Sequence, residues 1–213
     1  MTDDTTPKAA MVKEFMDAFD QTCYKNVTEV PCEVATLRAA LIREEHAEYM
    51  KAKVRSADEL DAIVDLLYVT LGTNLALGVP VQPYRSGQVR LASDKKFYVV
   101  HEVAEVVTDL DSKFPCAKIQ NHALAALTQR LIDTGRQRGY DLNGAFAAVH
   151  KANMGKLWSE VEVTTAKKDH AKDGSIKLKE IKGVPYYLVR NSLGKIIKPP
   201  SFQAADLAAF INP

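Results

Sequence analysis

The chain of 213 residues carries 28 lysines and arginines against 27 aspartates and glutamates, a formal net charge of +1. This balance creates no overall field that would favour a nucleic acid or a membrane surface as partner. The longest apolar stretch, residues 63–79, contains Asp65 together with Gly and Asn, so we expect no membrane span. The length suits one full hydrophobic core, with room for an appendage.

The first ten residues are polar and acidic, without the basic start and apolar block of a signal peptide. The three cysteines, Cys23, Cys32 and Cys116, are odd in number and follow neither a C-x-x-C nor a zinc spacing. We therefore expect free thiols in a soluble protein of the reducing cytoplasm.

The spacing of apolar residues predicts three helices in the first part of the chain. The first covers residues 10–22, and the second covers residues 33–54 after the break at Pro31. The third covers residues 58–78, where Ser56 and the glutamate three positions on form a capping box. This third helix is apolar over most of its surface and is expected to be buried.

The second part of the chain begins with residues 81–100, which are polar and rich in turn formers and predict a loop or a short strand. Three further amphipathic helices are expected at residues 101–114, 121–139 and 141–160. The cap of the last one is either Asp141 or Asn143.

The C-terminal part changes character. Residues 163–180 are low in apolar content and are expected to be mobile. Residues 184–202 place apolar, β-branched runs on both sides of "NSLG", which predicts a β-hairpin with Gly194 in its turn. The predicted fold class is therefore all-α, with a short β-hairpin tail at the C-terminus.

Two acidic clusters stand on the second and third predicted helices. Glu48 shares a helix face with both Glu44 and Glu45, because residues three or four apart lie one turn above each other. Asp61 and Asp65, four positions apart, share a face of the next helix. If these helices pack antiparallel, four or five carboxylates enter one cleft.

Two interpretations of these carboxylates compete. A solvated helix face, with glutamates paired to nearby lysines, accounts for the first cluster when it is taken alone. Asp65, however, lies among apolar neighbours, and a buried carboxylate without a partner is very costly. An all-oxygen set at helical spacing suits Mg²⁺ or Mn²⁺, cations that also share substrate phosphates. A metal site is therefore the favoured interpretation.

Rival catalytic signals are weak. No serine lies in a nucleophile elbow, and no phosphate loop of the G-x-x-x-x-G-K type is present. His101, Glu102 and Glu105 imitate a metal-binding helix, but the valines around them favour an ordinary amphipathic helix. His46 is either a supporting group behind the glutamates or a surface histidine.

"EEHAE" at 44–48, followed by "DAIVDLLYV" at 61–69, resembles the E-x-x-E … E/D-x-x(x)-D signature of all-α nucleoside triphosphate pyrophosphohydrolases. These are the MazG-like and phosphoribosyl-ATP-pyrophosphohydrolase-like proteins. Three further segments resemble the phage-type, MazZ-like branch: "DLLYVTLGTNLALGV" at 65–79, "VHKANMGKL" at 149–157 and "LGKIIKPPSFQAADL" at 193–207. The resemblance implies a MazG-like helical core over residues 1–165, with a helical insertion at 81–139 and a flexible segment and hairpin at 166–213.

The resemblance also implies hydrolysis of an NTP or dNTP between its α and β phosphates, through metal-assisted attack of water. Carried over by position, Glu45, Glu48 and Asp65 would ligate Mg²⁺, for which Mn²⁺ would substitute. Asp61 would join them, although its spacing of four from Asp65 departs from the commoner three. Glu44 and Glu45 would be the catalytic pair, with Glu44 serving a further metal or orienting the attacking water.

Substrate contacts follow from the same resemblance. His150, Asn153 and Lys156 match a phosphate-facing segment and line up roughly on one side of a helix. Lys195 and Lys198 would close over the polyphosphate from the tail.

The nucleoside contacts implied by the resemblance lie on the first and third helices. Phe15 and Phe19 would stack on the base, although their pattern alone is more typical of core residues. Tyr68 and Asn74 are candidates for sugar or base contacts.

Two features depart from the family pattern. The helices inserted at 81–139 would extend the bundle, build an oligomer contact or cover the site. "ANM" and "SFQAADL" replace the usual S-N-M and P-P-D segments, which leaves the docking of the tail open. A homodimer or homotetramer is expected, because a single family chain supplies only part of a four-helix bundle.

The expected substrate is a purine nucleotide such as dGTP or GTP, by analogy to phage enzymes, which would place the protein in the host cytoplasm. Two alternatives stay open. One is phosphoribosyl-ATP hydrolysis in histidine synthesis, and the other is a non-catalytic helical interaction module with a degraded site. The complete acidic set argues against the second.

Overall fold

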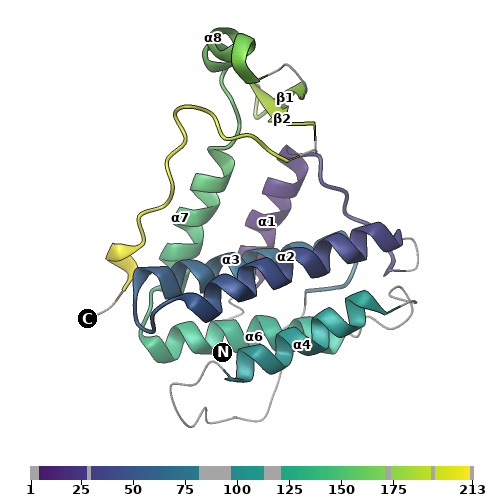
Figure 1. Cartoon of the computed structure of the whole chain (residues 1–213), viewed down its shortest axis with the longest axis vertical. Coiled ribbons are helices and arrows are strands. Elements are labelled where there is room, and N and C mark those ends of the chain that lie inside the picture. The colour runs from purple at the N-terminus through teal and green to yellow at the C-terminus, as the bar shows by residue number, and fades with distance from the viewer. Residues whose placement is uncertain are drawn as a thin grey trace.

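The computed structural model describes residues 5–27, 30–81, 97–112, 121–170, 174–192 and 195–211. This part is mostly helical, with an antiparallel pair of strands near the C-terminus, which confirms the predicted fold class (Figure 1). The elements are α1 (Thr6–Ala18), α2 (Cys32–Lys51), α3 (Ala57–Ala76), α4 (Phe97–Asp111), α6 (Asn121–Arg138), α7 (Leu142–Met154), α8 (Glu160–His170), β1 (Ser175–Ile181), β2 (Val184–Arg190) and the short helix η2 (Ala208–Phe210). No helix in these ranges is long and apolar enough to span a membrane.

The centre of the molecule is the pair α2 and α3, which the short connection at 52–56 makes antiparallel neighbours (Figure 1). Helix α3 is buried along most of its length, as predicted, and its side chains Leu60, Ile63, Leu67 and Leu71 are fully buried. Helices α1 and α7 both pack against α3 and against each other. This arrangement places α1, α2, α3 and α7 around the face that carries the acidic residues.

Helix α1 begins and ends earlier than the predicted range 10–22. Pro7 lies in its first turn, where a missing backbone N–H costs nothing. At its end, Asp20 adopts a positive φ of 52°, a conformation that stops a helix.

The inserted helices α4 and α6 pack against each other, and they also pack against α2 and α3, respectively (Figure 1). Of the three roles considered for the insertion, its described helices therefore extend the bundle. Four helices of one chain, α2, α3, α4 and α6, thus form a complete four-helix arrangement. The argument for a dimer or tetramer from an incomplete bundle does not apply to this chain, and its oligomeric state stays a prediction. The predicted loop at 81–100 lies almost entirely outside the described residues, and α4 already begins at Phe97.

The buried Glu59 links the start of α3 to the end of α6 through hydrogen bonds and an ion pair. The predicted capping box is present, since the backbone N–H of Glu59 donates to Ser56 Oγ at 3.2 Å. The Glu59 carboxylate is fully buried and accepts hydrogen bonds from Arg55 N at 2.7 Å and from Tyr140 Oη at 2.8 Å. Arg138 Nε forms an ion pair with the same carboxylate at 3.2 Å. Each charged group is thereby compensated.

The tail corrects two predictions. Residues 163–180, expected to be mobile, contain the end of α8 and all of β1 except its last residue. Ile176 and Leu178 alternate with charged residues along this half-exposed strand. β2 pairs with β1 and not with the residues that follow it. The hairpin turn is Lys182-Gly183, where positive φ angles of 52° and 79° match a two-residue hairpin turn. The predicted turn residue Gly194 lies outside the described residues.

The hairpin is docked onto the end of α1. Lys179 Nζ lies 2.5 Å from an oxygen of Asp20, and Arg190 Nη2 donates to the carbonyl oxygen of Phe19 at 2.7 Å. The tail then runs back along α7 to its N-terminus, where Asp141 N donates to the carbonyl oxygen of Phe210 at 2.9 Å (Figure 1). Asp141 is also the side-chain cap of α7, one of the two predicted possibilities.

We expect substitution of the buried Glu59 to lower the stability of the folded chain strongly. Glu59→Gln removes the charge that compensates Arg138, and we expect the free energy of unfolding to fall by about 2–4 kcal/mol in urea denaturation. The control is Asp58→Asn at the exposed neighbouring position, which should change it by less than about 0.5 kcal/mol. Equal effects of the two substitutions would contradict this account of the α3–α6 junction.

Candidate active site

A cavity of about 260 Å³ opens between α1, α2, α3 and the end of α7. Its lining combines carboxylates, an amide, a lysine and aromatic rings with aliphatic side chains. The lining residues are Val12, Phe15, Met16, Gln21, Arg38, Leu41, Glu45, Asp65, Tyr68, Val69, Gly72, Asn153 and Lys156. None of them comes from the described part of the insertion, which lies on the other side of α2 and α3.

The two predicted acidic helices meet in this cavity through Glu45 of α2 and Asp65 of α3. Burial, followed by the negative charges of Asp65 and Glu48, raises the pKa of Glu45 to about 8. Burial and the charge of Asp61 raise the pKa of Asp65 to about 7, against the opposing charge of Lys156. Both carboxylates thus stand in a field that disfavours their ionised form, which is the situation that a bound cation relieves.

The other predicted acidic residues stand at the rim. Glu44, Glu48 and Asp61 are exposed, and the pKa of Asp61 is raised by its partial burial and by the charge of Glu48. The effect of the Glu48 charge on Asp61 agrees with the antiparallel packing of α2 and α3, which turns the two acidic faces toward each other.

The donor chemistry of this set fits Mg²⁺ or Mn²⁺, since every candidate ligand is a carboxylate oxygen. The set is open: in the described residues, the three potential ligands whose atoms lie within 4.8 Å of one another are His101, Glu102 and Glu105 instead. Mg²⁺ usually keeps several waters and binds through one or two carboxylates. A hydrated cation is therefore compatible with carboxylates that do not touch one another.

Basic and amide groups face the carboxylates from α7 and the tail. Asn153 and Lys156 line the cavity, and Lys156 Nζ donates to Asn153 Oδ1 at 2.7 Å. Burial and the charge of Lys198 lower the pKa of Lys156, against the opposing charges of Asp65 and Glu45. Lys198, in the tail, is not part of the lining, and its Nζ lies 4.5 Å from the centroid of the Phe202 ring; its charge opposes the rise in the pKa of Asp65.

Two residues predicted to bind phosphate stand elsewhere. His150 is not part of the lining, and its ring nitrogens lie 3.0 Å from Tyr68 Oη and 3.3 Å from a Glu14 oxygen. Lys195 is exposed and also outside the lining, and its backbone N–H donates to Asn191 Oδ1 at 2.9 Å. His150 is thus placed to orient Tyr68 and not to meet a ligand in this cavity.

Of the four residues predicted to contact the nucleoside, two line the cavity and two do not. Phe15 and Tyr68 line the cavity with their rings edge to face, 5.7 Å apart between centroids. Phe19 is fully buried behind Phe15, at 4.4 Å between centroids, and acts as core. Asn74 is only 2% exposed and lies outside the lining. Direct contact with a nucleoside in this cavity is therefore open to Phe15 and Tyr68.

Two polar residues of the lining, Arg38 and Gln21, were not predicted from the sequence. Arg38 is only 8% exposed, and its Nη2 donates to Gln21 Oε1 at 3.2 Å. Burial lowers the pKa of this guanidinium. A signal for Arg38 was present, since it precedes Glu45 by seven positions, about two helical turns, and so shares its face.

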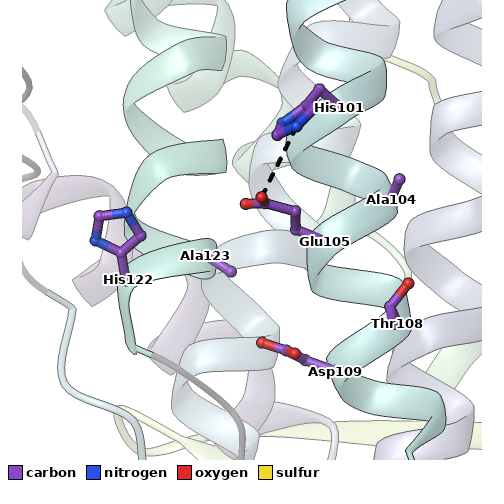
Figure 2. A pocket seen from close by; sticks show the side chains of 7 residues that line it. All are labelled: His101, Ala104, Glu105, Thr108, Asp109, His122 and Ala123. Carbon is purple, nitrogen blue, oxygen red and sulfur yellow. Dashed lines mark ion pairs between the residues drawn. The ribbon is translucent and has the colours of Figure 1, made fainter.

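A second concavity of about 430 Å³ lies between α4 and α6 (Figure 2). Its polar lining comes from His101, Glu105, Thr108 and Asp109 on α4 and His122 on α6. His101 Nε2 lies 3.8 Å from Glu105, but their side chains are 62% and 49% exposed. The adjacent Glu102 is paired with Arg130 at 3.3 Å. With Val103, Val106 and Leu110 buried on its inner side, α4 is the amphipathic helix that was favoured.

A family of known proteins matches the segment of the chain that contributes most of the cavity lining. Residues 12–86 match the family model described as phosphoribosyl-ATP pyrophosphohydrolase. No curated protein and no solved structure matches the chain significantly. The matched segment contains α2, α3 and most of α1, and therefore Phe15, Glu45, Asp65 and Tyr68. Residues 12–86, about a third of the chain, are thus similar to the phosphoribosyl-ATP pyrophosphohydrolase family, whereas a place in the phage-type branch stays a prediction.

Proposed function

We propose that the chain hydrolyses a nucleoside triphosphate between its α and β phosphates, with Mg²⁺ or Mn²⁺ as cofactor. Water enters the reaction, and a nucleoside monophosphate and pyrophosphate leave. The observation that carries the proposal is the meeting of Glu45 and Asp65 in a cavity that Lys156 also lines. The family match supports a nucleotide pyrophosphohydrolase in general.

The residues that would hold the cation are Glu45, Glu48, Asp61 and Asp65. A bound cation would neutralise their charge, polarise the phosphoryl oxygens and lower the pKa of a coordinated water. Lys156, which lines the cavity, and Lys198, whose charge acts on Asp65 from the tail, would bind the phosphates and balance their negative charge. The Asn153 amide, already hydrogen-bonded to Lys156, would hold that ammonium in place.

Glu44 would orient the attacking water. It is exposed at the rim and directly precedes Glu45, so its carboxylate is accessible to solvent beside the proposed cation site. A carboxylate in this position accepts a hydrogen bond from the water and takes up its proton as the new bond to phosphorus forms.

Two substrate classes follow from different observations. The resemblance to phage-type proteins supports a purine triphosphate such as dGTP or GTP. The description of the matched family supports phosphoribosyl-ATP equally well, as the second candidate. The presence of both Glu45 and Asp65 in one cavity argues against the third alternative, an interaction module with a degraded site.

A substrate panel tests the reaction. The chain is incubated with each NTP, each dNTP and phosphoribosyl-ATP in the presence of Mg²⁺, and pyrophosphate is measured separately from orthophosphate. We expect pyrophosphate and a monophosphate in equal amounts. Release of orthophosphate, or turnover of none of these compounds, would contradict the proposal.

Glu48 gives a test of the cation ligands. Glu48→Gln keeps the size of the side chain but removes a hard anionic ligand, so we expect kcat to fall by about 100-fold or more. The thermal midpoint should change little, because Glu48 is exposed. The matched control is Glu33→Gln, an exposed glutamate on the same helix, which should retain full activity. An active Glu48→Gln variant would remove Glu48 from the ligand set.

The raised pKa values predict an unusual pH dependence of stability without divalent cations. The pKa of Glu45 is about 8 in the folded chain, against an ordinary glutamate pKa of 4.5 in the unfolded chain. Between these limits the folded state binds more protons, so its contribution to stability falls as the pH rises. Glu45→Gln cannot ionise, and its thermal midpoint relative to wild type should therefore be higher at pH 8 than at pH 5.

Mg²⁺ provides the complementary measurement. A cation replaces the retained protons, so its addition should raise the thermal midpoint of the wild type more at pH 8 than at pH 5. Glu45→Gln should lose this difference. A stabilisation by Mg²⁺ that is equal at both pH values, or equal in both proteins, would contradict the linkage.

A further inference from the structure

The inner end of the active-site cavity is formed by a guanidinium. Arg38 lines the cavity and is 8% exposed, and its only hydrogen bond to another described residue runs from Nη2 to Gln21 Oε1. Its Nε is buried without a hydrogen-bond partner among the described residues. No described carboxylate forms an ion pair with it.

A buried cation of this kind is destabilising for the folded chain alone. Buried charges in proteins are normally paired with an opposite charge, and those without one cost several kcal/mol. The single amide oxygen of Gln21 satisfies one of the five N–H groups of the guanidinium. A buried charge that destabilises the folded chain is expected at a binding site, where the ligand supplies the missing partner.

The backbone of α3 makes room for this guanidinium at Gly72. A methyl group on Gly72 would lie 3.2 Å from Arg38 Nη1, closer than side chains normally approach, and at an ordinary contact distance of 3.6 Å from Val12. Glycine inside a helix lowers its stability relative to alanine. Gly72 therefore accommodates Arg38 at the expense of helix propensity.

The guanidinium and the acidic mouth lie at opposite ends of the cavity. Arg38 precedes Glu45 by seven positions on α2, and Gly72 follows Asp65 by seven positions on the antiparallel α3. Seven residues correspond to about 10 Å along a helix. A nucleotide whose phosphates lie at the carboxylates thus extends its base past Phe15 and Tyr68, toward Arg38.

The inner end offers hydrogen-bond donors. A guanidinium has no acceptor, and because Gln21 Oε1 already accepts from Arg38, the amide group of Gln21 has its N–H donors left. Guanine and hypoxanthine carry two adjacent acceptors, O6 and N7, which a guanidinium binds in bidentate fashion. Adenine presents an amino group in place of O6, and this donor would face the donors of Arg38.

We propose that Arg38, held by Gln21, binds the base of the nucleotide and selects guanine and hypoxanthine over adenine. This inference rests on the proposed function, which supplies the nucleotide. It goes beyond that function because it assigns the choice of base to a specific side chain outside the acidic set.

The test compares GTP, ITP and ATP as substrates of the full chain. For the wild type we expect kcat/KM for GTP and ITP to exceed that for ATP by about tenfold or more. Arg38→Met should lower kcat/KM for GTP and ITP by about tenfold or more while leaving ATP within about twofold. Gly72→Ala, which crowds the guanidinium from the facing helix, should change the selectivity in the same direction.

A matched control and a stability measurement separate this role from a structural one. Arg43→Met is the same substitution on the same helix, at an exposed arginine paired with Asp111, and should leave the selectivity unchanged. Arg38→Met should not lower the thermal midpoint, since it removes a buried charge that no carboxylate compensates. A large drop in the midpoint, or an equal loss for all three nucleotides, would overturn the assignment.

Binding of monophosphates keeps the inference independent of turnover. Calorimetry with GMP, IMP and AMP in the presence of Mg²⁺ should show tighter binding of GMP and IMP to the wild type, and no such preference in Arg38→Met. If the wild type hydrolyses no triphosphate, the proposed function fails, and this measurement still decides the role of Arg38. Equal affinities of the wild type for GMP and AMP would overturn it.

Discussion

The antiparallel packing of α2 on α3 is the constraint on which the rest of the structure depends. It places Glu45 opposite Asp65 at one end of the cavity and Arg38 opposite Gly72 at the other. Like charges brought together in this way repel, and burial adds to the cost, which is why the pKa values of both carboxylates rise. The stability needed to hold them has to come from the surrounding helices.

Those surroundings are built from the rest of the chain. The inserted helices α4 and α6 cover the far side of α2 and α3, where family members are expected to use a second subunit. The buried Glu59 fixes the junction between α3 and α6. On the open side, α1 and α7 form the walls of the cavity, and the tail holds α7 at both ends through Trp158 and Asp141. The described helices α1, α2, α3 and α7 therefore surround the cavity.

The sequence predicted the acidic part of the site because helical periodicity and a short connection leave few alternatives for two neighbouring helices. The sequence did not predict features that depend on the orientation of a side chain or on its burial in the folded chain. Helical spacing placed His150 near Asn153 and Lys156 but did not show that its ring turns toward Glu14 and Tyr68. The hairpin was misplaced because charged side chains on an exposed strand resemble a mobile segment. A lone arginine on a helix is usually solvated, and only the packing of α1 and Gly72 around Arg38 shows its burial.

The central claim is that the facing carboxylates of α2 and α3 form a cation site, and the most direct measurement is Mn²⁺ binding followed by electron paramagnetic resonance. The signal of free Mn²⁺ should decrease on addition of the wild-type chain, and nucleotide should then alter the spectrum of the bound ion. Asp65→Asn, which removes the more buried of the two facing carboxylates, should leave the Mn²⁺ signal free. Equal binding of Mn²⁺ by wild type and Asp65→Asn would contradict the account.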